Sequence, residues 1–181
     1  MNSVLLGLHG SLVYGGIMGV RAALEMVSNE LWSNERVSIR TINTEADLIY
    51  VAYECQLEDW QKELVNPAWF SIGRAYLFKE DNYPCIICNE ELKPIGFINL
   101  CKWLGEGDAF SFSYYIDKNY QGKGYGKSAA EVAIQILKAA DSKKPIKLAT
   151  ERENKKAQGL YTSLGFKLLN ELDGDDLVFA L

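Results

Sequence analysis

The residues of this sequence best suited to chemistry form a glycine-rich stretch, Gln121 to Ser128, between a predicted strand and a predicted helix. Glycines allow the backbone to come close to a ligand. The N-terminus of a helix adds unpaired N–H groups and a partial positive charge. Together these features predict an anion site that suits a pyrophosphate.

Three phosphate-binding motifs compete for this stretch. A Walker A loop needs a glycine at the position that Gln121 occupies. The dinucleotide pattern GxGxxG does not fit either, because Gly122, Gly124 and Gly126 occur at every second residue. The third pattern, Q-x-x-G-x-G, is met by Gln121, Gly124 and Gly126. We therefore interpret the stretch as a loop of the third kind.

A second group of residues lies in and just after a helix predicted over residues 154–164. Asn154 can cap the start of this helix, and Gly165 can end it. The group comprises Asn154, Ala157, Leu160, Tyr161, Gly165 and Phe166.

Together, the two groups resemble the two signatures of the GNAT superfamily of acetyl-CoA-dependent N-acetyltransferases. They occur in the order of that family with a predicted strand between them, and the resemblance covers roughly residues 37 to 181. Other residues are similar to those of bacterial spermine/spermidine acetyltransferases: Gln61, Lys62, Val65, Ser71, Ala75, Tyr76, Pro84, Gly96 and Phe97, with Glu171 to Gly174 near the end.

The resemblance implies a site for acetyl-CoA as co-substrate and no metal. In this family the strand before the loop separates from its neighbour and its backbone binds the pantetheine arm, while the loop binds the pyrophosphate. The cofactor-binding residues that the resemblance implies are Tyr114, Tyr115, Ile116, Gln121, Gly122, Lys123, Gly124, Tyr125, Gly126, Lys127, Ser128, Asn154, Ala157 and Tyr161.

By the same resemblance, Tyr161 is the catalytic residue. An amine attacks the thioester directly, coenzyme A leaves as a thiolate, and a nearby phenol can donate a hydrogen bond or a proton to the sulfur. The pKa of an aliphatic amine is about 10.4, so a base or a chain of water molecules must deprotonate it. The alternative interpretation of Tyr161 is a core tyrosine that packs beside Leu160 and Leu164.

The sequence departs from polyamine acetyltransferases at one position. Relatives carry an acidic residue on the strand that ends at Ile116, whereas this sequence has Phe112 there. Glu106, Asp108 and Glu151 are candidates elsewhere in the sequence for the base or the amine-binding carboxylate. The alternative is that they are ordinary solvated residues of turns and strand ends. Aromatic residues could bind an ammonium group by cation–π contacts or could belong to the core. They are Trp60, Trp69, Phe70, Tyr76, Trp103, Phe110, Phe112, Tyr114 and Tyr115.

The elements that must position these residues are read from hydrophobic periodicity and turn signals. Strands are expected over 37–42, 84–89, 93–101, 109–116, 146–150, 166–169 and 177–180. Helices are expected over 43–55, 57–65 and 71–77, after the glycine-rich loop, and over 154–164. The order combines an antiparallel meander with a crossover, so we predict an α+β fold with a central mixed sheet flanked by helices.

Composition excludes several classes of protein. The 181 residues carry a net charge of −5, which argues against a nucleic-acid-binding protein. The single histidine, His9, argues against a His-dependent catalytic triad and a Cys/His zinc site. Cys85 and Cys88 form a CxxC pattern, but positions i and i+3 of a strand face opposite sides. We therefore expect buried thiols of a reduced, cytoplasmic protein.

The N-terminal residues differ from the rest. Residues 1–34 are apolar and rich in glycine, without the basic start of a signal peptide or the unbroken apolar run of a membrane span. We predict a partly helical extension over 1–36 that docks on its own domain or on a second copy, which would give a homodimer, and an acetyltransferase domain over 37–181. The alternative is a chain that starts at Met26.

The sequence thus predicts a cytoplasmic acetyl-CoA-dependent N-acetyltransferase whose acceptor is a primary amine. Small amines such as polyamines are the first candidates for this acceptor. Two alternatives stay open. One is a protein or peptide N-acetyltransferase. The other is a non-catalytic acyl-CoA-binding module, in which the missing carboxylate marks lost chemistry. Neither a nucleic acid nor a membrane is expected as a partner.

Overall fold

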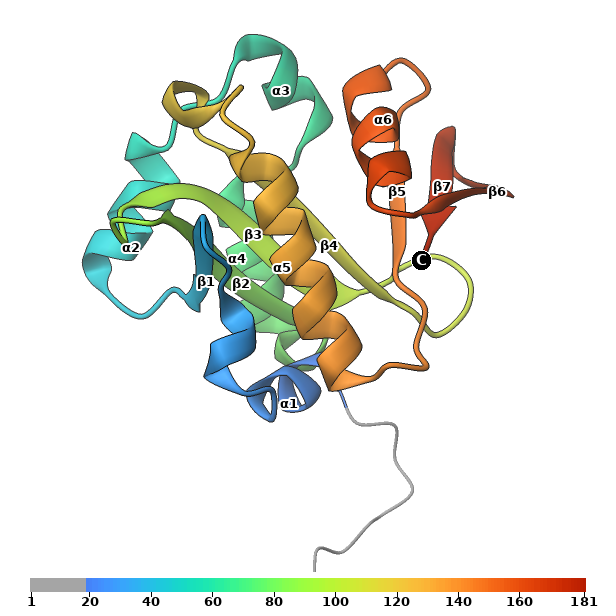
Figure 1. The fold of residues 1–181 in the computed structure, drawn as a ribbon, viewed down its shortest axis with the longest axis horizontal. Coiled ribbons are helices and arrows are strands. Elements are labelled where there is room, and N and C mark those ends of the chain that lie inside the picture. The colour runs from blue at the N-terminus through green and yellow to red at the C-terminus, as the bar shows by residue number, and fades with distance from the viewer. Residues whose placement is uncertain (1–18) are drawn as a thin grey trace, which may run out of the picture.

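Seven strands within the described residues, 19–181, form two antiparallel sheets in this computed structural model (Figure 1). The first sheet has the order β1-β2-β3-β4, with the bounds Val37–Thr41, Asn82–Asn89, Pro94–Lys102 and Phe110–Ile116. The second sheet has the order β5-β7-β6, with the bounds Lys147–Thr150 for β5, Asp176–Ala180 for β7 and Lys167–Asp173 for β6.

Helices occupy the connections between these strands. The α-helices are α1 (Val20–Glu25), α2 (Glu45–Ile49), α3 (Asp59–Leu64), α4 (Ala68–Leu77), α5 (Tyr125–Ala140) and α6 (Lys155–Ser163). Shorter helical segments are η1 (Asn29–Trp32), η2 (Tyr50–Glu54), η3 (Lys79–Asp81) and η4 (Lys118–Tyr120). The helix expected over 43–55 is divided, because α2 passes into the π-helical turn η2 at Tyr50.

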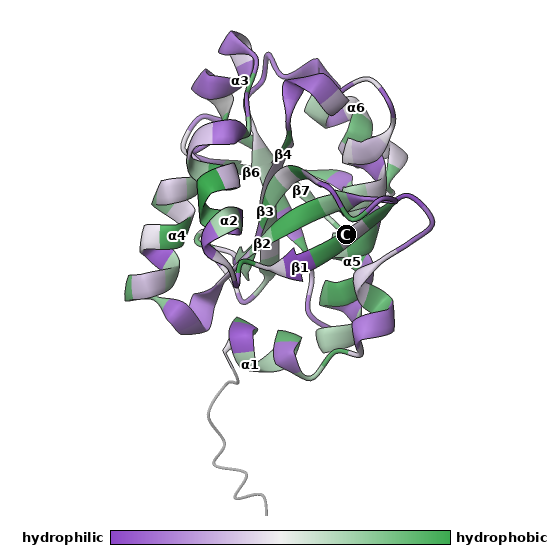
Figure 2. Cartoon of the chain, turned by 90° about the vertical axis from the view of Figure 1, so that its left-hand side faces the viewer, coloured by the Kyte–Doolittle hydropathy of each residue, from purple (hydrophilic) through white to green (hydrophobic). Residues whose placement is uncertain are grey.

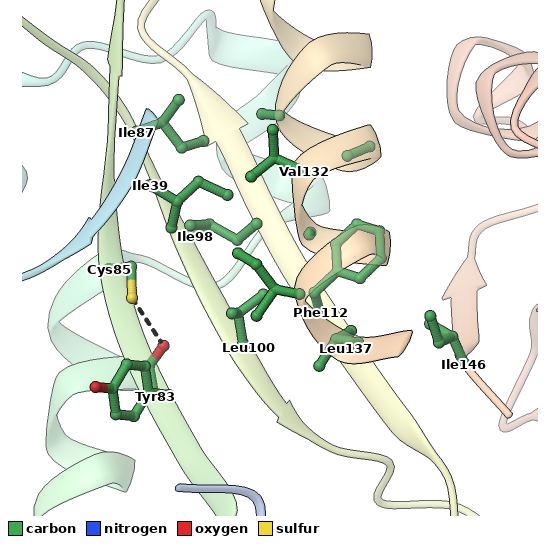
Figure 3. Close-up of a cluster of buried hydrophobic side chains, with 14 of the residues drawn as sticks. Ile39, Tyr83, Cys85, Ile87, Ile98, Leu100, Phe112, Val132, Leu137 and Ile146 are labelled. Atoms are coloured by element: carbon green, nitrogen blue, oxygen red, sulfur yellow. Dashed lines mark hydrogen bonds between the residues drawn. The ribbon is translucent and has the colours of Figure 1, made fainter. Parts of the chain in front are cut away.

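One face of the first sheet is covered by α5. The helix buries Ala129, Val132, Ala133, Ile136 and Leu137, the i, i+3, i+4 spacing of one helical face. Figure 3 shows Val132 and Leu137 packed over side chains of the strands, and Figure 2 shows that the central strands are mostly hydrophobic. Each fully buried aliphatic side chain contributes about 1.5–3 kcal/mol, so this contact fixes α5, and the loop before it, on the sheet.

The opposite face of the first sheet carries η2 and α4. Val51 and Ala68 of these helices form a second cluster with Ile86 and Cys88 of β2. Cys85 of the same strand belongs to the first cluster, as the alternation of side chains along a strand predicts. The expectation that Cys85 and Cys88 are buried on opposite sides of a strand is therefore confirmed, and both thiols are free.

The segment before β1 packs against the first cluster. Val20 and Leu24 of α1 are buried within it. The Leu31 carbonyl of η1 accepts a hydrogen bond of 2.8 Å from Gln135 of α5. Residues 1–18 of the expected extension lie outside the described residues, and the domain boundary at residue 36 stays a prediction.

The terminal hairpin is longer than the sequence suggested. β6 runs to Asp173 and β7 begins at Asp176, directly opposite in the register. Two residues connect them, and Gly174 has a φ of +61°, a left-handed conformation that short hairpin turns require. Asp176 therefore belongs to the strand and not to the turn.

Two features are absent from residues 19–181. No helix in this range is long and apolar enough to cross a membrane. No group of three or more His, Cys, Asp or Glu side chains in it is arranged to bind a metal ion.

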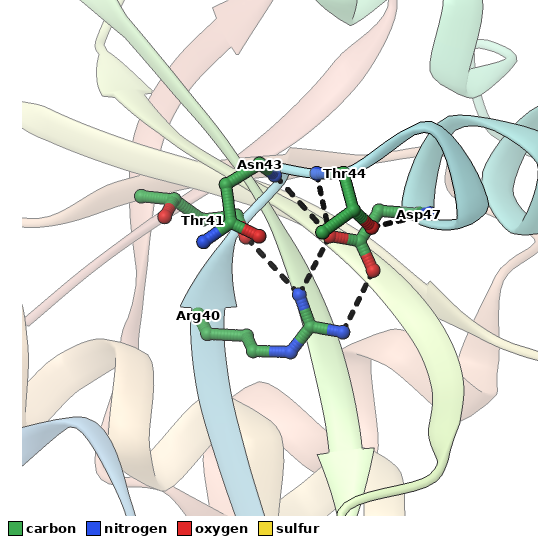
Figure 4. A network of polar contacts seen from close by, with 5 residues as sticks. All are labelled: Arg40, Thr41, Asn43, Thr44 and Asp47. Carbon is green, nitrogen blue, oxygen red and sulfur yellow. Dashed lines mark hydrogen bonds and ion pairs between the residues drawn. The ribbon is translucent and has the colours of Figure 1, made fainter.

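An ion pair between the half-exposed Arg40 and the buried Asp47 connects β1 to the start of α2 (Figure 4). Both carboxylate oxygens of Asp47 accept hydrogen bonds from the Arg40 guanidinium, at 2.7 and 2.8 Å. The same carboxylate accepts from the N–H groups of Asn43 and Thr44, and the Thr44 hydroxyl caps the N–H of Asp47. The hydrogen bond from Arg40 is the main reason why the pKa of Asp47 is well below its usual value.

Replacing Asp47 by Asn should lower the free energy of unfolding by about 2–3 kcal/mol at pH 7, because charge-assisted bonds are lost at a buried position. Since the folded state lowers the pKa of Asp47, its stabilisation is present above the unfolded value of about 3.9 and is lost as the pH falls below it. Urea denaturation of both proteins from pH 7 to pH 3 measures this difference.

Asp59→Asn is the matched control, because Asp59 forms an exposed ion pair with Lys62. We expect this variant to change stability little. An equal loss in the two variants at pH 7, or a loss in Asp47→Asn that does not become smaller between pH 5 and pH 3, would contradict the assignment.

Candidate active site

The two sheets meet at a single point. Phe110, at the start of β4, forms an isolated parallel bridge with Ile146, just before β5. Its N–H donates to the Pro145 carbonyl over 2.9 Å. No other bridge joins β4 to β5, both of which lie within the described residues. The two parallel strands therefore separate toward their C-terminal ends.

This separation leaves one edge of β4 without a partner strand. Every second residue of β4 forms backbone hydrogen bonds with β3. The N–H of Trp103 donates to the Ala109 carbonyl, and the N–H of Asp117 donates to the Ile95 carbonyl, so the odd-numbered residues face β3. Phe112, Tyr114 and Ile116 consequently direct their N–H and C=O groups toward β5. No described strand pairs with them there.

Two helices begin at the open end of the gap. α5 follows β4 through the glycine-rich loop, and α6 follows β5. Gly122 and Gly124 have φ values of +73° and +86°, which favour glycine. Gly124 is the N-cap of α5, and no described side chain caps that end. The N–H groups of the first turn of α5, beginning with Tyr125 and Gly126, are therefore available to a ligand.

The glycine-rich loop is kept in place by side chains from other elements. Gln121 donates to the Ile116 carbonyl over 2.9 Å and to the side-chain oxygen of Gln61 on α3. The Arg36 guanidinium donates to the Lys123 carbonyl over 2.7 Å. These bonds fix the loop before a ligand binds.

A cavity of about 540 Å³ occupies the gap between β4 and β5. Its walls come from β4, the glycine-rich loop, α3, α6, the end of β5 and the start of β7. On the outer side, the Lys156 ammonium of α6 lies 4.7 Å from the ring centre of Trp60 on α3. Lys156 and Trp60 both line the cavity, so this contact connects its two walls.

Tyr161 lies on the α6 wall of the cavity. Its ring centre is 5.9 Å from that of Phe166 and 5.5 Å from that of Phe179 on β7. Burial raises the pKa of Tyr161 to about 12, and the Asp176 carboxylate adds to the shift. Burial also raises the pKa of Tyr114, which faces the same space. Tyr161 thus packs in an aromatic cluster and keeps its phenol proton at neutral pH.

Comparison with known proteins decides the class of this site. Residues 46–166 match the model of the Acetyltransferase (GNAT) family. The chain belongs to the GNAT acetyltransferase family, and it is an acyltransferase. A curated relative, a probable spermine N(1)-acetyltransferase from Bacillus subtilis subsp. natto (strain BEST195), is 42% identical over 60 residues. That match covers 33% of this chain and 40% of the relative.

Solved structures of acetyltransferases share the fold. A dodecameric spermidine N-acetyltransferase from Vibrio cholerae in an intermediate state is 16% identical, with a TM-score of 0.59 over 81% of this chain and 92% of that one. A ribosomal-protein-S5-alanine acetyltransferase from Vibrio fischeri is 18% identical, with a TM-score of 0.55 over 82% and 94%. The predicted α+β fold of the GNAT type is confirmed.

Most of the cofactor residues predicted from the sequence line the cavity between β4 and β5. They are Tyr114, Tyr115, Ile116, Gln121, Gly122, Tyr125, Gly126, Asn154, Ala157 and Tyr161. Asn154 also caps α6, because its side chain accepts from the Ala157 N–H over 3.1 Å. Four predicted residues do not line the cavity: Lys123, Gly124, Lys127 and Ser128. The Ser128 side chain is buried on α5, and Lys127 is exposed.

The aromatic residues named from the sequence separate into three groups. Trp60, Phe112, Tyr114 and Tyr115 line the cavity of the acetyltransferase. Trp103 and Phe110 are buried in the core away from it, and Trp69, Phe70 and Tyr76 are exposed on α4. Fewer than half of the named aromatic residues therefore line the cavity.

The acidic residues of the cavity differ from those considered in the sequence. Phe112, at the position where the resemblance to polyamine acetyltransferases led us to expect a carboxylate, is buried. Glu106 and Asp108 do not line the cavity, whereas Glu151 does. Asp176 also lines it and was missed. The signal that could have found it is the short Asp173-Gly174 turn, which makes the next residues the start of a strand that returns toward the site.

Proposed function

We propose that this acetyltransferase moves an acetyl group from acetyl-CoA to a primary amine, and that small amines such as polyamines are its acceptors. The observation that carries the proposal is the cavity between β4 and β5, which joins an unpaired strand edge, the N-terminus of α5 and the phenol of Tyr161. The similarity to a probable spermine N(1)-acetyltransferase and to the fold of a spermidine N-acetyltransferase supports an amine acceptor.

The residues present fit coenzyme A. An extended arm with amide groups can pair with the free backbone groups of Tyr114, as an added strand pairs with a sheet edge. The N–H groups from Gly122 to Gly126 suit a pyrophosphate, which the N-terminus of the 16-residue helix α5 favours electrostatically. Lys123 and Lys127 add positive charge on either side of Gly124.

Acetyl-CoA, when bound, supplies an acyl group activated as a thioester. Tyr161 then faces a thiol whose pKa is about 8.5, well below its own value of about 12. Complete proton transfer from the phenol to the thiolate would be unfavourable by several kcal/mol. The role that fits is therefore a hydrogen bond from Tyr161 to the leaving sulfur. The backbone N–H of Tyr114 can donate to the acyl oxygen in the same way.

The shape of the cavity favours a small acceptor over a peptide. The Lys156–Trp60 contact connects α6 to α3 across its outer side, whereas a peptide substrate needs an open groove. The attacking nitrogen must be neutral, and a chain of water molecules in the cavity can take its proton.

The decisive experiment is acetyl-CoA turnover, measured as free thiol, against spermidine, spermine, short diamines, aromatic amines, amino acids and a lysine peptide. We expect turnover with the small alkylamines. Turnover with the peptide alone would favour protein acetylation. No turnover with any amine, despite binding of coenzyme A in calorimetry, would favour a binding module and contradict the proposal.

Substitution of Gly126 by Val tests the position of coenzyme A. A β-carbon at Gly126 would lie 3.7 Å from the Tyr114 hydroxyl, inside the cavity, and Gly126 lacks the positive φ that would strain a substitution at Gly124. We expect coenzyme A to bind at least about tenfold more weakly in isothermal calorimetry. Gly159→Ala, on the open side of α6, is the control. Unchanged affinity in Gly126→Val would refute the assignment.

Substitution of Tyr161 by Phe tests its role in catalysis. The variant keeps the aromatic packing but loses the hydrogen bond, so kcat should fall about 10²-fold while coenzyme A affinity changes little. Steady-state kinetics and calorimetry measure the two quantities. Tyr53→Phe, at an exposed position outside the cavity, is the control. A kcat equal to that of the control would remove Tyr161 from the mechanism.

Assembly and location remain predictions from the sequence. A homodimer formed through residues 1–34 depends on a segment of which residues 1–18 lie outside the described range. A cytoplasmic location is consistent with the free thiols of the described cysteines.

A further inference from the structure

The cavity has an acidic wall across from the glycine-rich loop. β7 pairs with β5 on the side away from β4. The last pair in their register joins Thr150 to Leu177, so one further step sets Glu151 opposite Asp176. Both carboxylates line the cavity. The loop that suits a pyrophosphate follows β4, on the other side of the gap.

The backbone position of Asp176 is fixed by the terminal hairpin. Asp176 pairs with Asp173 across the two-residue turn, and Gly174 supplies the left-handed conformation that the turn needs. Its carboxylate is thus presented by a strand and not by a flexible loop.

Asp176 has no cationic partner among residues 19–181. Three other carboxylates of the fold form ion pairs with nearby cations: Asp47 with Arg40, Asp108 with Lys144 and Glu171 with Lys147. Asp176 is half-buried, and burial together with the charges of Asp173 and Asp175 raises its pKa. A partly desolvated carboxylate without a partner attracts a cation more strongly than an exposed one does.

Asp176 also lines the same cavity as Tyr161, the phenol proposed to act on the leaving group. The charge of its carboxylate contributes to the raised pKa of Tyr161. A cation bound at Asp176 would therefore lie beside the reaction centre. Glu151 is exposed, so its attraction is more strongly screened by solvent. Phe112 leaves β4 without a carboxylate to compete with Asp176.

We propose that the Asp176 carboxylate binds one ammonium group of a diamine or polyamine acceptor beside Tyr161, while a second nitrogen of the acceptor, in its neutral form, attacks the thioester. This inference rests on the proposed function, which it deepens. Asp176 is then an acceptor-binding residue that β7 supplies from outside the two sequence signatures. The cavity has one region for an anionic donor, at the N-terminus of α5, and another for a cationic acceptor.

Asp176→Asn removes the charge and keeps the size of the side chain. With a short alkyl diamine as acceptor, we expect KM to rise about 10- to 100-fold, kcat to change far less, and coenzyme A affinity to stay the same. Asp175→Asn is the matched control, because Asp175 is exposed, neighbours Asp176 and does not line the cavity. Asp176→Glu should recover part of the loss in KM. Equal KM values in Asp176→Asn and Asp175→Asn would overturn the inference.

Amine binding in the absence of turnover separates this inference from the proposed function. Calorimetric titration of the diamine into the full chain saturated with coenzyme A should show at least about tenfold weaker binding to Asp176→Asn than to Asp175→Asn. This result would support the ammonium site even if the unmodified chain transferred no acetyl group. The absence of acetyl transfer would contradict the proposed function but not the ammonium site. Equal binding by the two variants, or no binding to the unmodified chain, would overturn the ammonium site.

Discussion

The separation of β4 from β5 after a single bridge is the constraint on which the rest of the site depends. Backbone N–H and C=O groups inside a protein need partners, and natural sheets normally pair or cover their edges. Here Phe110 bridges to Ile146, and the later residues of β4 turn their polar groups toward a cavity instead of a strand. A ligand with amide groups of its own can complete that edge, which explains why the site lies inside the sheet and not on its surface.

The same separation makes the cavity chemically unequal at its two sides. The parallel strands part toward their C-terminal ends, where α5 and α6 begin, so the N-terminus of α5 reaches the opening with its N–H groups uncapped by any described side chain. On the other side of β5, the hairpin of β6 and β7 presents Asp176. Under the proposed function, an anionic donor and a cationic acceptor would be directed to different walls, with Tyr161 and Asp176 lining the same cavity.

The parts of the site that the sequence predicted are local in the chain. The glycine-rich loop is recognisable because a turn of positive φ and a helix start lie within a few residues, and Gly122 and Gly124 adopt that conformation. The Asn154 cap of α6 was predictable for the same reason. The strands were predictable from alternation, with boundaries that shift by one or two residues at most ends and by four at the end of β6.

The remaining parts depend on contacts between distant segments. Asp176 enters the cavity because β7 inserts between β5 and β6, and a pairing order of this kind leaves no pattern in a single strand. The bond from Gln121 to Gln61 and the contact of Lys156 with Trp60 join residues far apart in the chain. The separation of β4 from β5 after Phe110 could not be predicted from the sequence either. A strand keeps the same hydrophobic alternation whether or not a partner strand pairs with its whole length.

The most direct test of the central claim is a crystal structure of the chain with coenzyme A bound. We predict that the pantetheine arm lies between β4 and β5 and pairs with the backbone of Tyr114, and that the pyrophosphate accepts hydrogen bonds from N–H groups between Gly122 and Gly126. Coenzyme A bound outside this cavity, or β5 paired along the whole length of β4, would contradict the account.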